Sequence, residues 1–321
     1  MTKTIILLAV LVVATNVAAQ HFEPPKTKTT VRVVNENGQP VENANVSLGF
    51  GNASVKGITD AKGCFSGEGI GDIRGIGCTI TKDGYYLSGA PIPRFHYSET
   101  SNRWEPWDET YTTILRPIGK PIALYAKKVQ VNIPVLDKPC GYDLEVSDWV
   151  MPYGKGMKKD FVFTIRTKEV KDAGNFDAQG DLTFANSLDG LQETTVPEVG
   201  KNSAFRWKRL APENGYQPKF QLQNTWWESL HQKPIRSFKF GGKEWEGYFF
   251  RVRTVEQNGQ IVSAHYGKIR GGIEIEPRET PTCTIIFTYY FNPTPNDRNL
   301  EWDTKKNLIG GLKDMESPRE P

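Results

Sequence analysis

Alternation of apolar and polar residues with a period of two is the feature that most constrains how this chain folds. In the segment 44–50, valine, leucine and phenylalanine alternate with asparagine, serine and glycine. The segments 128–135, 161–166 and 285–291 repeat the pattern. Successive side chains of a β-strand point to opposite faces, so each segment predicts a strand with one buried face. Short helical turns are expected only near 184–191 and 226–231.

Turn signals separate the predicted strands. The clearest is Asn258-Gly259, which lies between two β-prone arms that run from Tyr248 to Ile269. Asn-Gly favours the type I′ turn, whose twist matches that of paired strands. The segments 35–38, 60–63 and 82–84 each end in glycine and predict further turns. With 30 glycines, 21 prolines and short apolar runs, the chain is expected to be all-β.

The length of the chain favours two domains, because 321 residues exceed what one hydrophobic core usually organises. Two prolines in the segment 116–121 precede a new alternating segment and mark the expected junction. The segment 91–109 is irregular, rich in aromatic residues and proline, and predicted to be a long loop. The expected organisation is a linker at 20–29, a β-sandwich at 30–117, a larger β-sandwich at 118–312, for which a jelly-roll is one arrangement, and a polar tail at 313–321.

The N-terminus has the pattern of a secretory signal peptide at 1–19. One lysine precedes an apolar run from Ile5 to Val13, and small residues end at Ala19 before Gln20. The run is shorter than the about 20 apolar residues that a membrane helix needs. Cleavage between Ala19 and Gln20 predicts a secreted or periplasmic protein. No other segment is long and apolar enough for a transmembrane segment.

The cysteines fit an oxidising compartment. Their number is even, which permits two disulfides and three connectivities among Cys64, Cys78, Cys140 and Cys283. Cys64 and Cys78 flank a glycine-rich segment and are candidates to face each other across adjacent strands. Two buried free thiols are the alternative at that position.

A resemblance to a known family covers about 28–117. The step from Gly38 to Val46, which reads Gly-Gln-Pro-Val-Glu-Asn-Ala-Asn-Val, is followed by the turn segments 57–65 and 82–86 and the strand 112–116. In this order the elements resemble a carboxypeptidase regulatory-like domain. The resemblance implies a seven- or eight-stranded transthyretin-like (prealbumin-like) sandwich, with 91–109 as an insertion.

The remainder of the chain resembles the C-terminal part of exported bacterial proteins that also carry this first domain. The segments 121–129, 141–145 and 148–156 prompt the comparison. The resemblance implies no activity. The prediction that this part of the chain forms a second, β-rich domain therefore rests on its strand patterns alone.

The family name raises the question of a zinc peptidase site. Such enzymes bind zinc through His-x-x-Glu and a distant histidine. His96 and Glu99 have this spacing, and His231 and His265 lie downstream. Because the pair falls in the insertion and the later chain lacks an α/β pattern, chance is the preferred interpretation. No Gly-x-Ser-x-Gly elbow or phosphate-binding glycine loop occurs, so we expect no catalytic residue, no cofactor and no enzyme activity.

A calcium site is the weaker metal hypothesis. Four oxygen-bearing side chains cluster in a segment predicted as a loop, namely Asp172, Asn175, Asp177 and Asp181. Their spacing does not match an EF-hand. Acidic and asparagine-rich turns are ordinary in β proteins, so the expected metal content is none.

Four tryptophans are the candidate ligand-binding residues. Trp104 and Trp107 lie in the insertion, and Trp226 and Trp227 are adjacent in sequence. Exposed aromatic side chains with polar neighbours form platforms for sugar rings or partner proteins. The alternative is that these side chains fill the cores, where large aromatic residues usually lie.

These patterns predict an exported, non-catalytic interaction or scaffold protein, with association with the cell envelope as one option. Its expected partner is an envelope protein or a glycan. A glycan-binding module is the first alternative, and a hydrolase with a site in the second domain is the second. The formal net charge of +3 gives no electrostatic basis for binding nucleic acid.

Overall fold

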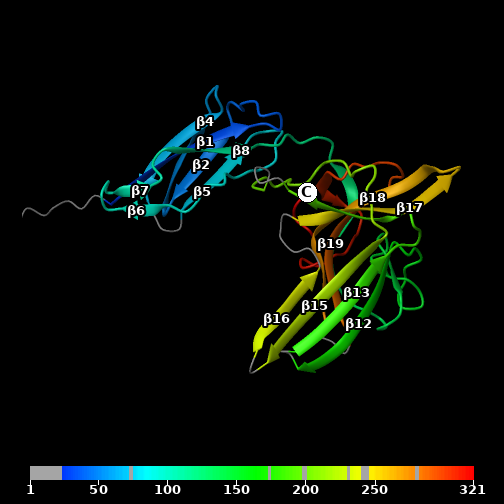
Figure 1. Cartoon of the computed structure of the whole chain (residues 1–321). Helices are drawn as coiled ribbons and strands as arrows, with labels where there is room; N and C mark the ends of the chain where they lie inside the picture. Colours follow the sequence, from blue (N-terminus) through cyan, green and yellow to red (C-terminus); the bar gives the residue numbers. More distant parts are fainter. Residues whose placement is uncertain are drawn as a thin grey trace, which may run out of the picture.

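The computed structural model describes residues 24–71, 75–172, 175–196, 201–229, 232–239, 246–278 and 282–321. Within these ranges the structure contains β-strands and no helix, and the strands form four sheets (Figure 1). The expected all-β fold is therefore confirmed. The predicted signal peptide and its cleavage position at Ala19 and Gln20 lie outside the described residues.

The strands follow one another along the chain as β1 (Lys26–Val34), β2 (Asn45–Phe50), β3 (Ala53–Ile58), β4 (Cys64–Ile70), β5 (Ile76–Thr81), β6 (His96–Ser98), β7 (Arg103–Glu105), β8 (Glu109–Ile114), β9 (Ile122–Asn132), β10 (Cys140–Asp143), β11 (Asp148–Trp149), β12 (Phe161–Asp172), β13 (Asn175–Thr183), β14 (Gly190–Thr195), β15 (Lys219–Ser229), β16 (Gln232–Lys239), β17 (Glu246–Gln257), β18 (Gln260–Glu276), β19 (Thr284–Asn292) and β20 (Trp302–Asn307).

The strands β1 to β8 form two sheets that face each other. In the larger sheet β1 pairs with β4, β7 and β8, and β6 pairs with β7. The smaller sheet has the order β3-β2-β5 and is antiparallel throughout. Val31 and Val33 of β1 and Leu48 of β2 are fully buried between them. The alternation that buries Leu48 turns its polar neighbours in β2 outward.

The strands β9 to β20 form two six-stranded sheets, with the orders β11-β10-β12-β13-β15-β16 and β14-β17-β18-β19-β9-β20. Aromatic side chains fill the space between the sheets. The rings of Phe161 and Phe250 meet edge-to-face with centroids 5.1 Å apart, a preferred geometry for aromatic pairs. At the predicted hairpin between β17 and β18, Asn258 and Gly259 have φ values of 51° and 77°, as a type I′ turn requires.

Two local expectations differ from the structure. The segment 226–231 is not a helical turn where it is described, because β15 continues to Ser229. Adjacent tryptophans favour an extended strand, where their bulk packs against neighbouring strands. The segment 91–109 is not a continuous loop, because β6 and β7 pair as a short hairpin and Arg103 pairs with Lys26 of β1.

The cysteines form no disulfide. All four are free thiols, which agrees with the alternative of free thiols at Cys64 and Cys78, although these two side chains are half-buried and not fully buried. Cys64 belongs to β4 of the larger sheet, whereas Cys78 belongs to β5 of the smaller one, so the two do not lie on adjacent strands. Cys140 and Cys283 are both buried in the second core.

The C-terminal segment, which the sequence predicts to be a polar tail, packs against β9, β18 and β19. Glu316 pairs with Lys127 at 3.2 Å, and Glu320 pairs with Arg270 at 2.6 Å. The hydroxyl of Tyr290 donates a hydrogen bond of 2.9 Å to the carbonyl of Glu320. Through these contacts the tail covers part of the outer face of this sheet. No helix long and apolar enough to cross a membrane occurs among the described residues.

Main-chain hydrogen bonds join the two halves of the chain. Ser88 pairs with Ile80 of β5, and Ser203 pairs in turn with Ser88. The amide of Gly89 donates to the carbonyl of Asn202 at 2.9 Å, and the amide of Ala204 donates to the carbonyl of Leu87 at 2.8 Å. The small sheet β3-β2-β5 is thus extended by the segments 87–89 and 202–204. We refer to this extended surface as the composite sheet.

A network of charged side chains beside the composite sheet holds the same junction. The carboxylate of Glu36 accepts hydrogen bonds from Arg116 at 2.8 Å and from Arg209 at 2.7 Å. Both guanidinium groups also lie over the ring of Phe205. The buried carboxylate of Glu301 accepts a hydrogen bond of 2.7 Å from the hydroxyl of Tyr86. Residues from both halves therefore neutralise one another at the junction.

Candidate functional site

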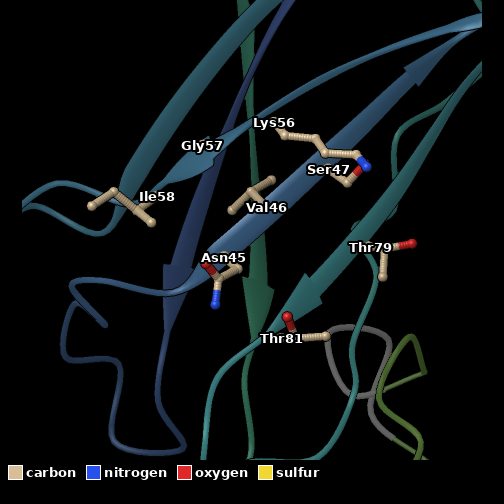
Figure 2. Close-up of a pocket in the computed structure, with 8 residues that line it drawn as sticks. All are labelled: Asn45, Val46, Ser47, Lys56, Gly57, Ile58, Thr79 and Thr81. Carbon is tan, nitrogen blue, oxygen red and sulfur yellow. The ribbon is translucent and has the colours of Figure 1, made fainter.

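A groove on the outer face of β3-β2-β5 is the candidate site (Figure 2). Two rows of side chains cross the three strands at right angles. In the first row Lys56 lies opposite Ser47, and Ser47 lies opposite Thr79. The second row is formed in the same way by Ile58, Asn45 and Thr81. Since residues directly opposite each other in antiparallel strands point to the same face, all six side chains project from the outer face.

The sequence folds this way locally because each outward residue alternates with a core residue. Val46, Leu48 and Ile80 point inward and are at most 2% exposed. Their neighbours in sequence are small and polar, so they leave an open face rather than covering it. Beyond the first row the outward positions are Ser54 of β3, Gly49 of β2 and Gly77 of β5. On β2 and β5 the groove therefore ends on bare main chain.

The groove has a volume of about 520 Å³. This volume falls within the range of about 300–1,000 Å³ that is typical of small-ligand sites. Its polar groups are three hydroxyls, one amide and one ammonium, from Ser47, Thr79, Thr81, Asn45 and Lys56. Figure 2 shows the ammonium group of Lys56 beside Ser47. Ile58, which is 57% exposed, forms an apolar side of the groove.

These side chains offer hydrogen bonds and one positive charge. Serine and threonine hydroxyls both donate and accept, and asparagine does so through separate atoms. Among the residues that line the groove, Lys56 is the one with a charged side chain. Such a set suits a ligand that is rich in hydroxyl groups and carries little charge. It contains no carboxylate or imidazole that would act as a general base.

The structure places the predicted tryptophans elsewhere. Trp104 packs against the first core and lies so close to Gly71 that a Cβ there would come within 1.8 Å of the indole. Trp107 is half-buried, with the guanidinium of Arg103 4.9 Å from its ring centre. Trp226 is also half-buried, and the side chain of Trp227 lies outside the described residues.

The β6–β7 hairpin, which carries Trp104, and the groove lie at opposite ends of the first sandwich, the one formed by β1 to β8. The groove surrounds Asn45 at the start of β2, whereas Phe50 ends β2 beside Gly69 of β4. Two residues beyond Gly69, Gly71 contacts Trp104. The tryptophans therefore do not line the groove.

The zinc candidates do not form a metal site in the described part of the chain. His96 and Glu99 are exposed on the β6–β7 hairpin. His265 belongs to β18 in the second sandwich, and His231 lies outside the described residues. In the residues that the structure covers, no three His, Cys, Asp or Glu side chains are arranged to hold a metal ion.

Three of the calcium candidates, Asn175, Asp177 and Asp181, lie along β13 rather than in a loop, and Asp172 is the last residue of β12, which corrects the prediction. Asp177 and Asp181 are four residues apart in β13, a separation of about 13 Å in an extended chain, too far for one ion. Asp181 pairs with Arg166 and Lys219, and Asp177 accepts a hydrogen bond from Thr225. The side chain of Asp172 lies outside the described residues. Asn175 begins the same strand.

Buried carboxylates of the second sandwich are engaged by an arginine. Asp160 accepts two hydrogen bonds of 2.7 Å from Arg253, which also pairs with Glu145. Burial raises the pKa of Asp160, and the hydrogen bonds and charge of Arg253 oppose that rise. Burial alone would also raise the pKa of Asp143, but hydrogen bonds from backbone amides, including that of Lys158, outweigh burial, so the pKa of Asp143 is lowered. These contacts fix loops against β17.

Sequence reasoning missed the groove because its residues are ordinary outward-facing strand residues. The alternation in 44–50 does place Asn45 and Ser47 on the solvent face. It does not reveal that β3 and β5 align their own small polar residues beside them. That alignment depends on strand register, which the pattern of a single strand does not specify.

Comparisons with known proteins identify no family. No family model and no curated protein matches the chain. A solved DUF3823 family protein from Bacteroides ovatus is 10% identical, with 83% of this chain and 95% of that chain covered and a TM-score of 0.21. A candidate carbohydrate binding protein from Bacteroides uniformis is 9% identical, with 83% and 98% covered and a TM-score of 0.22. At these TM-scores neither similarity bears on function.

Proposed function

We propose that the chain is an exported, non-catalytic binding protein that holds a glycan on the outer face of β3-β2-β5. The observation that carries this proposal is the groove of about 520 Å³ with its two rows of cross-strand side chains. Export rests on the N-terminal leader pattern. A glycan of the cell envelope or surroundings is the ligand that such a protein would meet.

The chemistry of the groove fits a sugar chain. A sugar ring carries hydroxyl groups around its edge and C–H groups on its faces. Ser47, Thr79 and Asn45 supply donors and acceptors for the hydroxyl groups, and Ile58 supplies an apolar contact for the C–H groups. Because the net contribution of a neutral hydrogen bond is only about 0.5–1.5 kcal/mol, several such contacts are needed for measurable affinity.

A binding role without catalysis follows from the same residues. Hydrolysis of a glycosidic bond normally requires two carboxyl groups that flank the bond. The residues lining the groove include no aspartate or glutamate. The paired carboxylates of the second sandwich are bound by Arg253 instead.

Binding is tested by removing one hydroxyl from the groove. Thr79→Val keeps the shape of an exposed strand residue and removes its hydrogen-bonding group. The matched control is Thr112→Val, which changes another exposed threonine, on β8 of the other sheet. A glycan array first identifies a ligand for the purified chain, and calorimetry then measures its affinity.

The proposal predicts that Thr79→Val weakens binding about fivefold, as expected for one lost hydrogen bond, while Thr112→Val leaves the affinity unchanged. An array without a bound glycan contradicts the proposal. Equal affinities of the two variants contradict the location of the site.

A further inference from the structure

A second groove adjoins the first on the composite sheet. It has a volume of about 360 Å³ and is lined by Thr79, which also lines the first groove. Leu87 and Gly89 line it from the first half of the chain, and Asn202 and Ala204 line it from the second half. The two hollows therefore meet at one strand, β5, and the second reaches the junction between the sandwiches.

Strand register carries the rows of the first groove into the second. Because Ile80 pairs with Ser88, Thr79 lies opposite Gly89 and Thr81 lies opposite Leu87. Because Ser88 pairs with Ser203, Gly89 lies opposite Asn202 and Leu87 opposite Ala204. Burial agrees with this register, since Ser88 and Ser203 are 3% and 2% exposed whereas Leu87 is 53% exposed.

Two continuous rows thus cross five chain segments. The polar row consists of Lys56, Ser47, Thr79, Gly89 and Asn202. The mixed row consists of Ile58, Asn45, Thr81, Leu87 and Ala204. With neighbouring strands about 4.8 Å apart, five segments span about 19 Å.

We infer that the composite sheet binds an extended, uncharged oligosaccharide, with one subsite on β3-β2-β5 and a second subsite formed by Leu87, Gly89, Asn202 and Ala204. This inference rests on the proposed function and specifies the length of the ligand and the part of the second half that contacts it. The ligand crosses the strands and spans both sandwiches.

Charge and position favour this occupant. Across the ten positions of the two rows, Lys56 is the one formal charge. Arg206 and Glu320 also line the second groove, with opposite charges, and Glu320 is already paired with Arg270 at 2.6 Å. A strongly charged ligand would meet no matching row of charges. Ile58 and Leu87 are exposed aliphatic residues at two separate positions of the mixed row. Each can contact the apolar face of a different sugar of the same chain.

The junction is also a favourable place for a ligand, because binding sites occur preferentially at domain interfaces. β5 and the segment 202–204 lie more than a hundred residues apart in the sequence. A ligand that touches both segments stabilises their pairing. A short ligand confined to the first groove does not.

Three asparagine substitutions separate the subsites. Asn45→Ala changes the first subsite, and Asn202→Ala changes the second while keeping the main-chain carbonyl that accepts from Gly89. Asn52→Ala is the control, because Asn52 is exposed in the turn between β2 and β3. Affinities are measured by calorimetry for neutral gluco-, xylo- and manno-oligosaccharides of two, four and six sugars, and for acidic oligosaccharides and acidic peptides of similar length.

We expect the affinity of the unmodified chain to rise at least tenfold from two to six sugars. Asn45→Ala weakens all lengths about fivefold, Asn202→Ala weakens only the longer ones, and Asn52→Ala changes none. If no oligosaccharide of any length or charge binds, the proposed function itself fails. If short and long chains bind equally and Asn202→Ala has no effect, the proposed function stands and this inference is overturned. Binding only of acidic oligosaccharides or peptides also overturns it.

Discussion

Replacing Lys268 by methionine should stabilise this protein. Lys268 lies on β18 opposite Phe249 and Tyr290 and is 1% exposed. Its Nζ has no hydrogen-bond partner within the described residues, and it lies 4.7 Å from the ring centre of Tyr290 and 5.3 Å from that of Phe205. Burial and the like charges of Arg116 and Arg270 lower the pKa of Lys268 to about 7, while Glu301 opposes them.

The size of the effect follows from the pKa. A fall from the usual 10.5 to about 7 corresponds to roughly 4–5 kcal/mol, at about 1.36 kcal/mol for each pKa unit. Methionine matches the length of the lysine side chain and needs no hydrogen bond. Replacement of a buried ion pair by well-packed apolar residues is often neutral or stabilising by about 1–4 kcal/mol. We therefore expect Lys268→Met to raise the free energy of unfolding by about 2–4 kcal/mol at pH 7.

The pH dependence has a defined sign. Between pH 7 and pH 10.5 the unfolded chain binds a proton at Lys268 that the folded chain has released, so the stability of the unmodified chain rises with pH in this window. The methionine variant lacks this contribution. Its advantage is therefore largest at pH 7 and shrinks toward pH 10.

Urea unfolding at pH 7 and pH 9.5 measures both effects, because equal slopes allow midpoints to be compared as free energies. Lys128→Met, at an exposed position of β9, is the control and should change stability by less than about 0.5 kcal/mol. A Lys268→Met variant that is less stable than the unmodified chain at pH 7, or whose advantage does not shrink with pH, refutes the reasoning.

Two further predictions concern the junction and the thiols. Glu36→Gln should make the stability of the protein depend less on pH in the acid range. Burial alone would raise the pKa of Glu36, but the hydrogen bonds and charges of Arg209 and Arg116 outweigh burial, so the pKa is lowered. The stability from this pairing is therefore present above the usual pKa of 4.5 and is lost as pH falls through the lowered pKa. Acid titrations followed by fluorescence that coincide for the two proteins would exclude this role. The free thiols predict that a reducing agent leaves the urea midpoint unchanged. Cys140 and Cys283 should be alkylated only after unfolding because they are buried, whereas Cys64 and Cys78 are half-buried and should react in the folded protein. A midpoint lowered by reduction would show that disulfides form.

The parts of the fold that sequence predicted are those encoded by local pattern. Period-two alternation identified the strands around 44–50, 161–166 and 285–291, because burial of one face leaves a direct trace in the residue order. Asn258-Gly259 identified its hairpin because both residues tolerate positive φ. These signals require no knowledge of distant partners.

The composite sheet was not predictable by the same means. Ser88 and Ser203 are 115 positions apart in the sequence and polar, and their pairing depends on how the two halves dock. The groove residues also carry no distinctive spacing, since threonine and serine are common on solvent-facing strands. The tryptophans attracted attention by their chemistry, but Trp104 serves the core.

Hydrogen exchange of the chain with and without a six-sugar ligand tests the central claim most directly, because amides that contact the ligand or are stabilised by it exchange more slowly. The account predicts slower exchange in the segments 45–58, 77–81, 87–89 and 202–204 and unchanged exchange in the hairpin 96–105. Protection confined to that hairpin or to the second sandwich, with the composite sheet unchanged, would contradict it.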